Sequence, residues 1–348
     1  MSDPMLDIIV AHCREPWQVG EKLFRMLALQ RGINFEDFRV MLVQDGTDGA
    51  LPWRQVLSAL PYRVKIMTIP HGGVSAARNA GMDSATSDWI CFCDFDDTFT
   101  DIYALRAVFG SITQPGADMI WCGLLGESFD DSGTFHLDRF PRNEIFIHGK
   151  FFRRAFLKES GLRFREDISF AEDTLFCETA AILLRQERVR EIPQVLYARC
   201  FQEGSLTHNP RNNFRNARDL FRKRRILAET YREHGLQQNF SGMITRTVCD
   251  YYFALNYPDY PDPQYFLRDF RDFWQRYGHV FRDTERNNPS LLALMLDASR
   301  REAVSKGYLI SEHITLRDWL RNVTQEGDET QYDTPAPHGS VHRLSELI

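Results

Sequence analysis

The sequence predicts an α/β protein followed by an α-helical region. Over the first hundred residues, short apolar runs alternate with segments of helical spacing, as a sheet of parallel strands requires. Beyond about position 210 the pattern changes to long helical segments rich in arginine and aromatic residues, without further strand–helix alternation. A chain of 348 residues that is 43% hydrophobic can also bury a substantial core.

The change in pattern predicts three parts. The α/β domain covers residues 1–209, and a helical domain covers residues 210–325. The last segment, 326–348, places glycine and proline among polar residues, so it has little to bury and is expected to be a flexible tail.

The first predicted elements follow from local pattern. The run at 6–11 is apolar, and the segment 17–30 repeats apolar residues at helical spacing. Ser75, behind the Gly72-Gly73 turn, is the expected cap of the next helix. In chain order we expect a strand over 6–11, a helix over 17–30, strands over 38–43 and 63–69, a helix over 75–84 and a strand over 89–93.

The later elements alternate less regularly. Acidic residues suit the start of a helix, so a helix is expected behind Glu172. The segment 127–134 contains turn residues and is expected to be a polar loop. The remaining expectations are a helix over 101–112, a strand over 119–124, a basic amphipathic segment over 149–159, a helix over 173–184 and a strand over 195–200.

Composition narrows the function. The net charge of −6 and the pI near 6.0 argue mildly against a protein whose whole surface binds nucleic acid. No apolar run reaches the roughly 20 residues that span a bilayer, and the N-terminus lacks a signal pattern, so we expect a cytoplasmic protein. The seven cysteines lack zinc spacing and are expected to be reduced, buried thiols.

A cluster of carboxylates, Asp94-Phe95-Asp96-Asp97, follows the apolar strand at 89–93. Open α/β sheets bind ligands at the carboxyl ends of their strands, and carboxylates two residues apart can share one hard cation. The expected cargo is therefore a metal-bound diphosphate. The alternative is a solvated acidic pair without a ligand.

Two blocks of sequence resemble family-2 glycosyltransferases. The first joins Gly73–Gly81 to Asp88-Trp89-Ile90 and the carboxylate cluster. The second, which looks like the acceptor-side block of the family, runs through Gly149–Arg154, Gly161–Phe164 and Ala171–Phe176. The resemblance covers about residues 6–207. It implies the GT-A fold, a Rossmann-like, nucleotide-binding mixed central sheet flanked by helices.

The resemblance also implies roles for the carboxylates. Asp96 would be the principal ligand of Mn²⁺ or Mg²⁺, Asp94 would support the metal or the ribose of the donor, and Asp97 would orient them. In the second block, Asp173 would be the catalytic base, with Glu172 beside it. The alternative is that Glu172 and Asp173 only cap a helix and interact favourably with its dipole.

The nucleotide site is assigned by the same resemblance. Asp45 matches the position that hydrogen-bonds the pyrimidine of a uridine-type donor, and Ala11 and His12 would line the same base pocket. Arg78 would lie near the donor phosphates or the aspartate cluster, and His208 is a further candidate metal ligand. The alternatives are an ordinary turn at Asp45-Gly46, a structural histidine at position 12 and a loop histidine at 208.

The chain departs from the family pattern in places. Gln44-Asp45-Gly46-Thr47 has one acidic residue where relatives usually have two, which leaves the donor less certain. No Gln-x-x-Arg-Trp motif follows Glu203–Thr207, which argues against a processive polysaccharide synthase. In the helical region, Arg222–Arg225 is either a solvated face or a site for a phosphate-bearing acceptor, an anionic lipid or nucleic acid, and the dense aromatics are expected to form a core.

The sequence therefore predicts a metal-dependent, inverting glycosyltransferase. It would move a sugar from a nucleotide-sugar donor, with a UDP-sugar favoured, to an acceptor hydroxyl by single displacement. The identity of the acceptor stays open among a protein, a glycan or polymer, a lipid-linked oligosaccharide and a modified nucleobase. The helical domain is expected to serve acceptor binding or oligomerisation, and a homo-oligomer through this domain is a further expectation. The alternatives are a nucleotidyltransferase and a non-catalytic binding module with the same fold.

Overall fold

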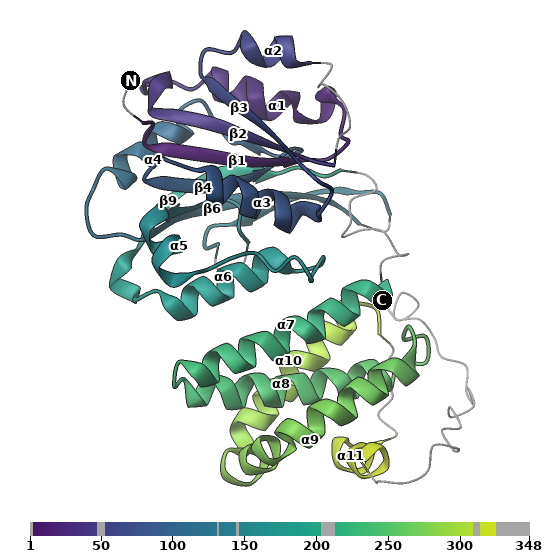
Figure 1. The fold of residues 1–348 in the computed structure, drawn as a ribbon. Helices are drawn as coiled ribbons and strands as arrows, with labels where there is room; N and C mark the ends of the chain where they lie inside the picture. The colour runs from purple at the N-terminus through teal and green to yellow at the C-terminus, as the bar shows by residue number, and fades with distance from the viewer. Residues whose placement is uncertain are drawn as a thin grey trace. The chain divides into compact units, whose positions relative to one another are not determined.

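The chain forms two compact units, one up to Gly235 and one from Leu236 on. The computed structural model describes residues 3–46, 53–130, 132–143, 146–202, 213–308 and 314–324 (Figure 1). Helix α7 (Asn213–Glu233) packs against α6 (Glu172–Leu183) and falls in the first unit. The packing boundary thus lies one helix later than the sequence boundary near 210, while the functional division into domains stays a prediction.

The first unit is built on a nine-stranded sheet with the order β3-β2-β1-β4-β8-β6-β9-β5, and β7 pairs with β6. Strands β1 to β4 are parallel where they pair, as the sequence predicted, whereas β8 runs antiparallel to both β4 and β6 and makes the sheet mixed. The strands are β1 (Leu6–His12), β2 (Phe38–Asp45), β3 (Arg63–Ile69), β4 (Trp89–Asp94), β5 (Thr98–Phe99), β6 (Met119–Phe129), β7 (Phe135–Phe140), β8 (Lys150–Arg153) and β9 (Val189–Arg199).

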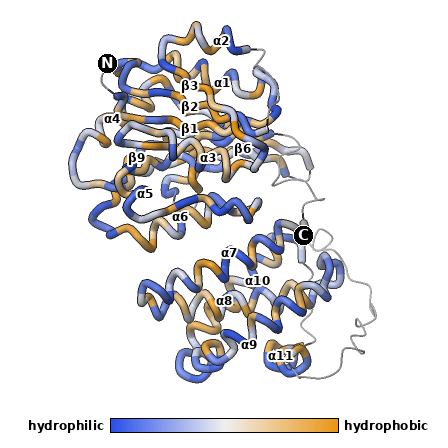
Figure 2. Tube along the Cα trace, in the orientation of Figure 1, coloured by the Kyte–Doolittle hydropathy of each residue, from blue (hydrophilic) through white to orange (hydrophobic). Residues whose placement is uncertain are grey.

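Helices cover both faces of this sheet. Successive residues of β1 point to opposite faces, so Ile8 and Val10 join the core with α1 and α4, while Ile9 joins the core with α3, α5 and α6. Figure 2 shows hydrophobic colour along these central strands. Besides α6 and α7, the helices of this unit are α1 (Trp17–Ala28), α2 (Arg54–Ser58), α3 (Gly73–Ser84), α4 (Ala104–Ile112) and α5 (Arg154–Ser160), with short 3-10 turns at Phe35–Asp37 and Gln186–Arg188.

Two glycines allow close approaches beside the strand ends. A Cβ atom on Gly81 of α3 would lie 2.5 Å from Cγ2 of Ile9 in β1, so α3 sits directly on the sheet. A Cβ atom on Gly20 of α1 would lie 2.3 Å from the ring of Phe95, the residue between Asp94 and Asp96. Overpacking at such contacts is destabilising, so both glycines fix how closely the helices flank the carboxylate cluster.

Two local predictions were wrong. Helix α3 begins at Gly73, with Gly72 as its N-cap and no side-chain cap, so Ser75 lies inside the first turn. The segment predicted as a polar loop over 127–134 instead continues β6 to Phe129 and turns into β7. Strand β7 is exposed along nearly its whole length, and its alternation of apolar and polar residues is only four residues long, Phe135-His136-Leu137-Asp138.

The second unit is helical, and its aromatic residues form its core, as expected. Tyr251, Phe266, Phe270 and Trp319 are almost completely buried. The helices are α8 (Gln237–Leu255), α9 (Pro263–Asn287), α10 (Pro289–Ser305) and α11 (Leu316–Thr324).

The structure shows the state of the cysteines and the length and apolarity of the helices. All seven cysteines are free, and five of them are buried. In the portion of the chain that is described, no helix combines the length and apolarity needed to cross a membrane.

Candidate active site

The sequence-predicted donor residues gather at one edge of the sheet. In the parallel register, Ala11 of β1 pairs with Val43 of β2 and with Asp94 of β4. Strands β1, β2 and β4 therefore end together and bring Ala11, His12, Asp45 and Asp94 to the same side. This is the edge at which open α/β sheets bind ligands.

Asp94, the last residue of β4, is held from both sides. Arg78 Nη2 donates to Oδ1 of Asp94 at 2.8 Å, and His148 Nε2 lies 2.9 Å from Oδ2. Burial opposes ionisation, but His148 and Arg78 together hold the pKa of Asp94 well below its usual range. Asp94 is thus a fixed carboxylate anion.

Asp97 faces inward and Asp96 does not. Asp97 is buried and accepts hydrogen bonds from Tyr197 Oη at 3.0 Å and from the backbone N–H of Cys200 at 2.9 Å. Burial, reinforced by Asp94 and Asp96, raises the pKa of Asp97 to about 7. Asp97 therefore connects the cluster to the end of β9.

Asp96 is partly exposed, and among the described residues its carboxylate has no side-chain partner. Burial and the neighbouring charge of Asp94 raise the pKa of Asp96. A bound cation would relieve both effects, which the more distant charges of Lys22 and His148 offset only in part.

Arg78 joins the two sequence blocks. This buried guanidinium, on α3, donates from Nη2 to Asp94 and from Nη1 to Oε1 of Glu172 at 2.9 Å. Burial opposes the charge, but Asp94 and Glu172 raise the pKa of Arg78 further above its usual range. Asp94 and the second sequence block thus share one cation.

The neighbouring residue of α3, Asn79, makes a second connection. Its Nδ2 donates to the carbonyl of Phe164 at 3.0 Å, and its Oδ1 accepts from the N–H of Phe164 at 3.0 Å. Nδ2 also donates to Glu166 at 2.9 Å. The Arg78-Asn79 pair of the first block therefore fixes the chain of the second block.

Glu172 and Asp173 begin helix α6 without capping it. The N-cap is Ala171, which has a left-handed backbone (φ 61°) and makes no side-chain cap bond. Such a conformation is costly for a residue with a side chain and often occurs at functional sites. Burial raises the pKa of Glu172, although the charge of Arg78 opposes this rise. Asp173 is partly exposed, and its carboxylate accepts a hydrogen bond from the N–H of Thr174 at 2.7 Å.

Helix α7 holds the loop before α6. Buried Asp219 accepts from the N–H groups of Ser169 and Phe170 at 2.8 and 3.2 Å. Arg222 donates to Asp167, and Lys223 forms an ion pair with Glu178 of α6 at 2.6 Å. Part of the basic run at 222–225 is thus engaged in fixing the acceptor-side block rather than forming a solvated face.

In the predicted base pocket, Asp45 and His12 make contacts with neighbouring parts of the protein itself. Asp45 is buried and accepts from the N–H groups of Gly72 and Gly73, at 2.7 and 3.0 Å, at the start of α3. An anion there favours the helix dipole. His12 is buried, its Nε2 lies 2.9 Å from the carbonyl of Glu15, and its ring packs 4.7 Å from that of Phe95. The roles of Asp45, His12 and Ala11 toward a nucleobase stay predictions.

His148 is a site residue that the sequence reasoning missed. It is buried, its ring stacks on Tyr197 with centroids 5.4 Å apart, and its Nε2 lies 3.7 Å from Asp97 as well as 2.9 Å from Asp94. Burial opposes protonation, but Asp94 raises the pKa of His148 above its usual range. The signal available was its position directly before Gly149-Lys150, where the second block begins.

We expect His148→Ala to lower the free energy of unfolding by about 2 kcal/mol, because it removes a buried hydrogen bond between charged groups. Urea unfolding of the variant and the wild type measures this. His136→Ala, which removes an exposed histidine 2.9 Å from Asp130 on the β7 hairpin, is the control and should leave stability unchanged. Equal effects of both substitutions would contradict the role of His148.

Two clusters of potential metal ligands occur among the described residues. In the first, donor atoms of Asp94, Asp97 and His148 lie within 4.8 Å of one another, and in the second, so do those of Cys13, Asp45 and His71. Asp96 joins neither cluster, and His208 and Glu203–Thr207 lie outside the described residues. The predicted ligand role of Asp96 accordingly stays a prediction.

Sequence comparison adds independent findings. Residues 7–192 match glycosyl transferase family 2. The uncharacterized glycosyltransferase EpsJ of Bacillus subtilis is 27% identical over 199 residues, which are 50% of this chain and 56% of that protein. The succinoglycan biosynthesis protein ExoW of Rhizobium meliloti is 34% identical over 110 residues, 30% of this chain and 34% of ExoW. The matched part of the chain thus spans about half of the length of EpsJ and about a third of the length of ExoW.

Solved structures share the fold. S. aureus TarS 1–349 in complex with UDP-GlcNAc superposes with a TM-score of 0.61 at 16% identity, covering 89% of this chain and 94% of that one. The complex of the same protein with UDP gives 0.58 at 17% identity, covering 89% and 95%. The GT-A fold expected from the sequence is confirmed.

Proposed function

Because the chain belongs to glycosyl transferase family 2, we propose that it transfers a sugar from a nucleotide-sugar donor to an acceptor hydroxyl. The observation that carries this proposal is the Arg78 bridge, because one buried cation joins Asp94 on the donor side to Glu172 on the acceptor side. A UDP-sugar is the favoured donor. The UDP and UDP-GlcNAc complexes of TarS, a protein of the same fold, support this choice.

In this proposal Asp173 is the general base. It stands at the start of α6, partly exposed beside buried Glu172, so an acceptor hydroxyl can approach it. A hydroxyl is a weak nucleophile at neutral pH and needs a carboxylate to take its proton as the bond forms. Attack opposite the departing diphosphate inverts the anomeric carbon in one displacement.

The site fits a divalent cation, with Mn²⁺ and Mg²⁺ as the candidates. Asp96, which makes no side-chain ion pair among the described residues, and Asp94 would hold it, and His208 is a third candidate from sequence. When bound, such a cation neutralises the charge that develops on the leaving diphosphate. Action in the cytoplasm and assembly through the helical unit stay predictions.

The donor and the metal are tested together by calorimetry of UDP, GDP, CDP and TDP with and without Mn²⁺. We expect UDP to bind most tightly, and Asp96→Asn to weaken UDP binding in Mn²⁺ by more than about tenfold. Without Mn²⁺ the variant should bind UDP at least as well as the wild type, because a carboxylate that repels the diphosphate is gone.

Two results would overturn these assignments. Equal UDP affinity of wild type and Asp96→Asn in Mn²⁺ would remove Asp96 from the metal site. Release of pyrophosphate from a nucleoside triphosphate and a sugar phosphate would identify a nucleotidyltransferase, and absence of any donor turnover with every UDP-sugar tried would identify a binding module.

A further inference from the structure

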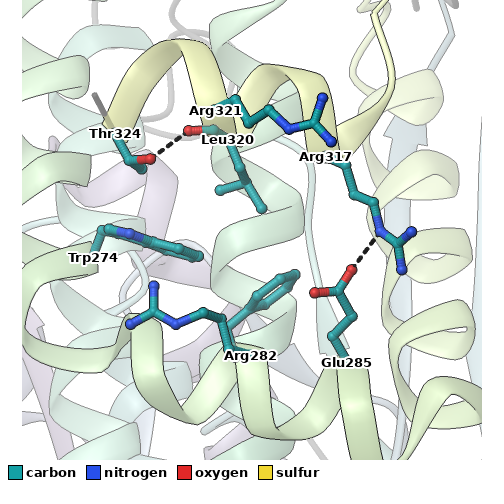
Figure 3. A pocket seen from close by; sticks show the side chains of 8 residues that line it. Trp274, Arg282, Glu285, Arg317, Leu320, Arg321 and Thr324 are labelled. Atoms are coloured by element: carbon teal, nitrogen blue, oxygen red, sulfur yellow. Dashed lines mark hydrogen bonds and ion pairs between the residues drawn. The ribbon is translucent and has the colours of Figure 1, made fainter.

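A pocket of about 240 Å³ opens between α9 and α11 in the helical unit. Figure 3 shows Trp274 and Arg282 at one end, the pair of Arg317 and Glu285 at the other, and Leu320 reaching in from α11. A water occupies about 30 Å³ in the liquid, so this volume suits a ligand of about the size of a monosaccharide with one small substituent. All of its lining residues belong to the second unit, whereas Asp94 and Asp173 belong to the first.

The pocket is positively charged although the protein as a whole carries −6. Three arginines and one glutamate line it. Arg317 forms an ion pair with Glu285 at 2.7 Å. Arg321 forms an ion pair with Asp318 at 3.0 Å, and the side chains of both residues are more than half exposed. Such an exposed pair is weak, so Arg321 can turn to another anion at little cost.

Arg282 has no carboxylate partner in the described ranges. Its guanidinium lies 5.3 Å from the ring centroid of Trp274, and this cation–π contact is its one interaction among the described residues. A guanidinium keeps its fork of N–H donors in this arrangement, and that fork matches the geometry of phosphate and carboxylate oxygens.

The apolar part of the pocket is fixed in place. Trp274 is partly exposed, and its ring lies across Gly278, where a Cβ atom would come within 2.8 Å of it. The ring centroids of Phe281 and Trp274 lie 5.7 Å apart, and Leu320 of α11 lines the same pocket. A rigid aromatic surface beside a free guanidinium offers one apolar contact and one charged contact to the same small molecule.

We propose that this pocket binds an anionic sugar, with the phosphate or carboxylate group on Arg282 and Arg321 and the ring against Trp274 and Leu320. The proposal does not depend on the transferase activity, because it concerns residues of the second unit and is tested by direct binding.

The experiment is ¹⁹F NMR of the full chain labelled with fluorotryptophan at its six tryptophan positions. Trp274→Phe identifies the signal of Trp274. We expect glucose 6-phosphate to shift this signal saturably, glucuronate to do so more weakly, and glucose and inorganic phosphate alone to bind at least about tenfold less tightly.

Matched variants make the outcome decisive. Arg282→Ala should weaken glucose 6-phosphate binding about tenfold, and Arg282→Lys should recover part of it. Arg301→Ala removes the same charge from an exposed site on α10 outside the pocket and should change nothing. No shift with glucose 6-phosphate, equal binding by inorganic phosphate, or equal loss in Arg282→Ala and Arg301→Ala would overturn the proposal.

Discussion

Replacing Asp173 by asparagine is expected to lower the rate of sugar transfer by about 10² to 10⁴ while UDP affinity and folding stay unchanged. The side chain is partly exposed and accepts one hydrogen bond, from the N–H of Thr174, which an asparagine oxygen can still accept. The substitution therefore removes the proton acceptor and leaves the start of α6 intact. Transfer from a UDP-sugar, assayed as UDP release in the presence of an accepted hydroxyl compound, measures the effect.

Asp83→Asn is the matched control for this prediction. Asp83 is an exposed carboxylate at the end of α3 that pairs with Arg163, so its loss should leave transfer within about threefold of the wild type. Retained transfer in Asp173→Asn would remove Asp173 from the mechanism. Loss of UDP binding along with transfer would show instead that Asp173 supports the donor site.

Local pattern was sufficient to predict the central strands. The apolar runs of β1, β2 and β4 are buried on both faces, so their sequences read as continuous hydrophobic stretches whatever surrounds them. Strand β7 was missed because its residues are exposed and only Phe135-His136-Leu137-Asp138 alternates between apolar and polar residues. Helix α7 resembles the later helices in its sequence pattern, and only its contacts with α6 assign it to the first unit.

The candidate site could be predicted residue by residue, but its connections could not. Asp94 and Asp173 follow from motifs, whereas the bridge from Asp94 through Arg78 to Glu172 joins residues up to 94 positions apart. His148 carries no motif of its own. Its role arises because Gly149, with a left-handed backbone, turns the chain into β8 beside β4, and no sequence pattern encodes that juxtaposition.

The Arg78 bridge leads to the second large expected effect, which is on stability. Arg78→Met keeps most of the buried volume but leaves the carboxylates of Asp94 and Glu172 without their shared cation. Breaking a buried ion pair on one side costs about 3 to 5 kcal/mol, which corresponds to a fall in Tm on the order of 10 °C. Thermal unfolding followed by circular dichroism measures it.

The loss of stability in Arg78→Met should depend on pH in a definite direction. Burial already raises the pKa of Glu172, and Arg78 opposes that rise, so removing Arg78 should raise the folded-state pKa further above the unfolded value of about 4.3. The folded variant then binds more protons than its unfolded state at pH values between the two. Its stability should accordingly fall as pH rises through the folded-state pKa, and the deficit relative to wild type should be smallest near pH 4.3 and below.

Glu172 supplies the matched test of the cause. If Arg78 stabilises the fold by compensating carboxylates, adding Glu172→Gln to Arg78→Met should recover part of the lost stability, whereas two independent losses would add. Arg78→Lys keeps a charge but lacks the fork that reaches both carboxylates, so it should lie between Arg78→Met and the wild type and gives a measurable variant even if Arg78→Met does not fold. Additive losses in the double variant, or an Arg78→Lys variant as stable as the wild type, would show that the two sequence blocks are held together by packing rather than by the shared charge of Arg78.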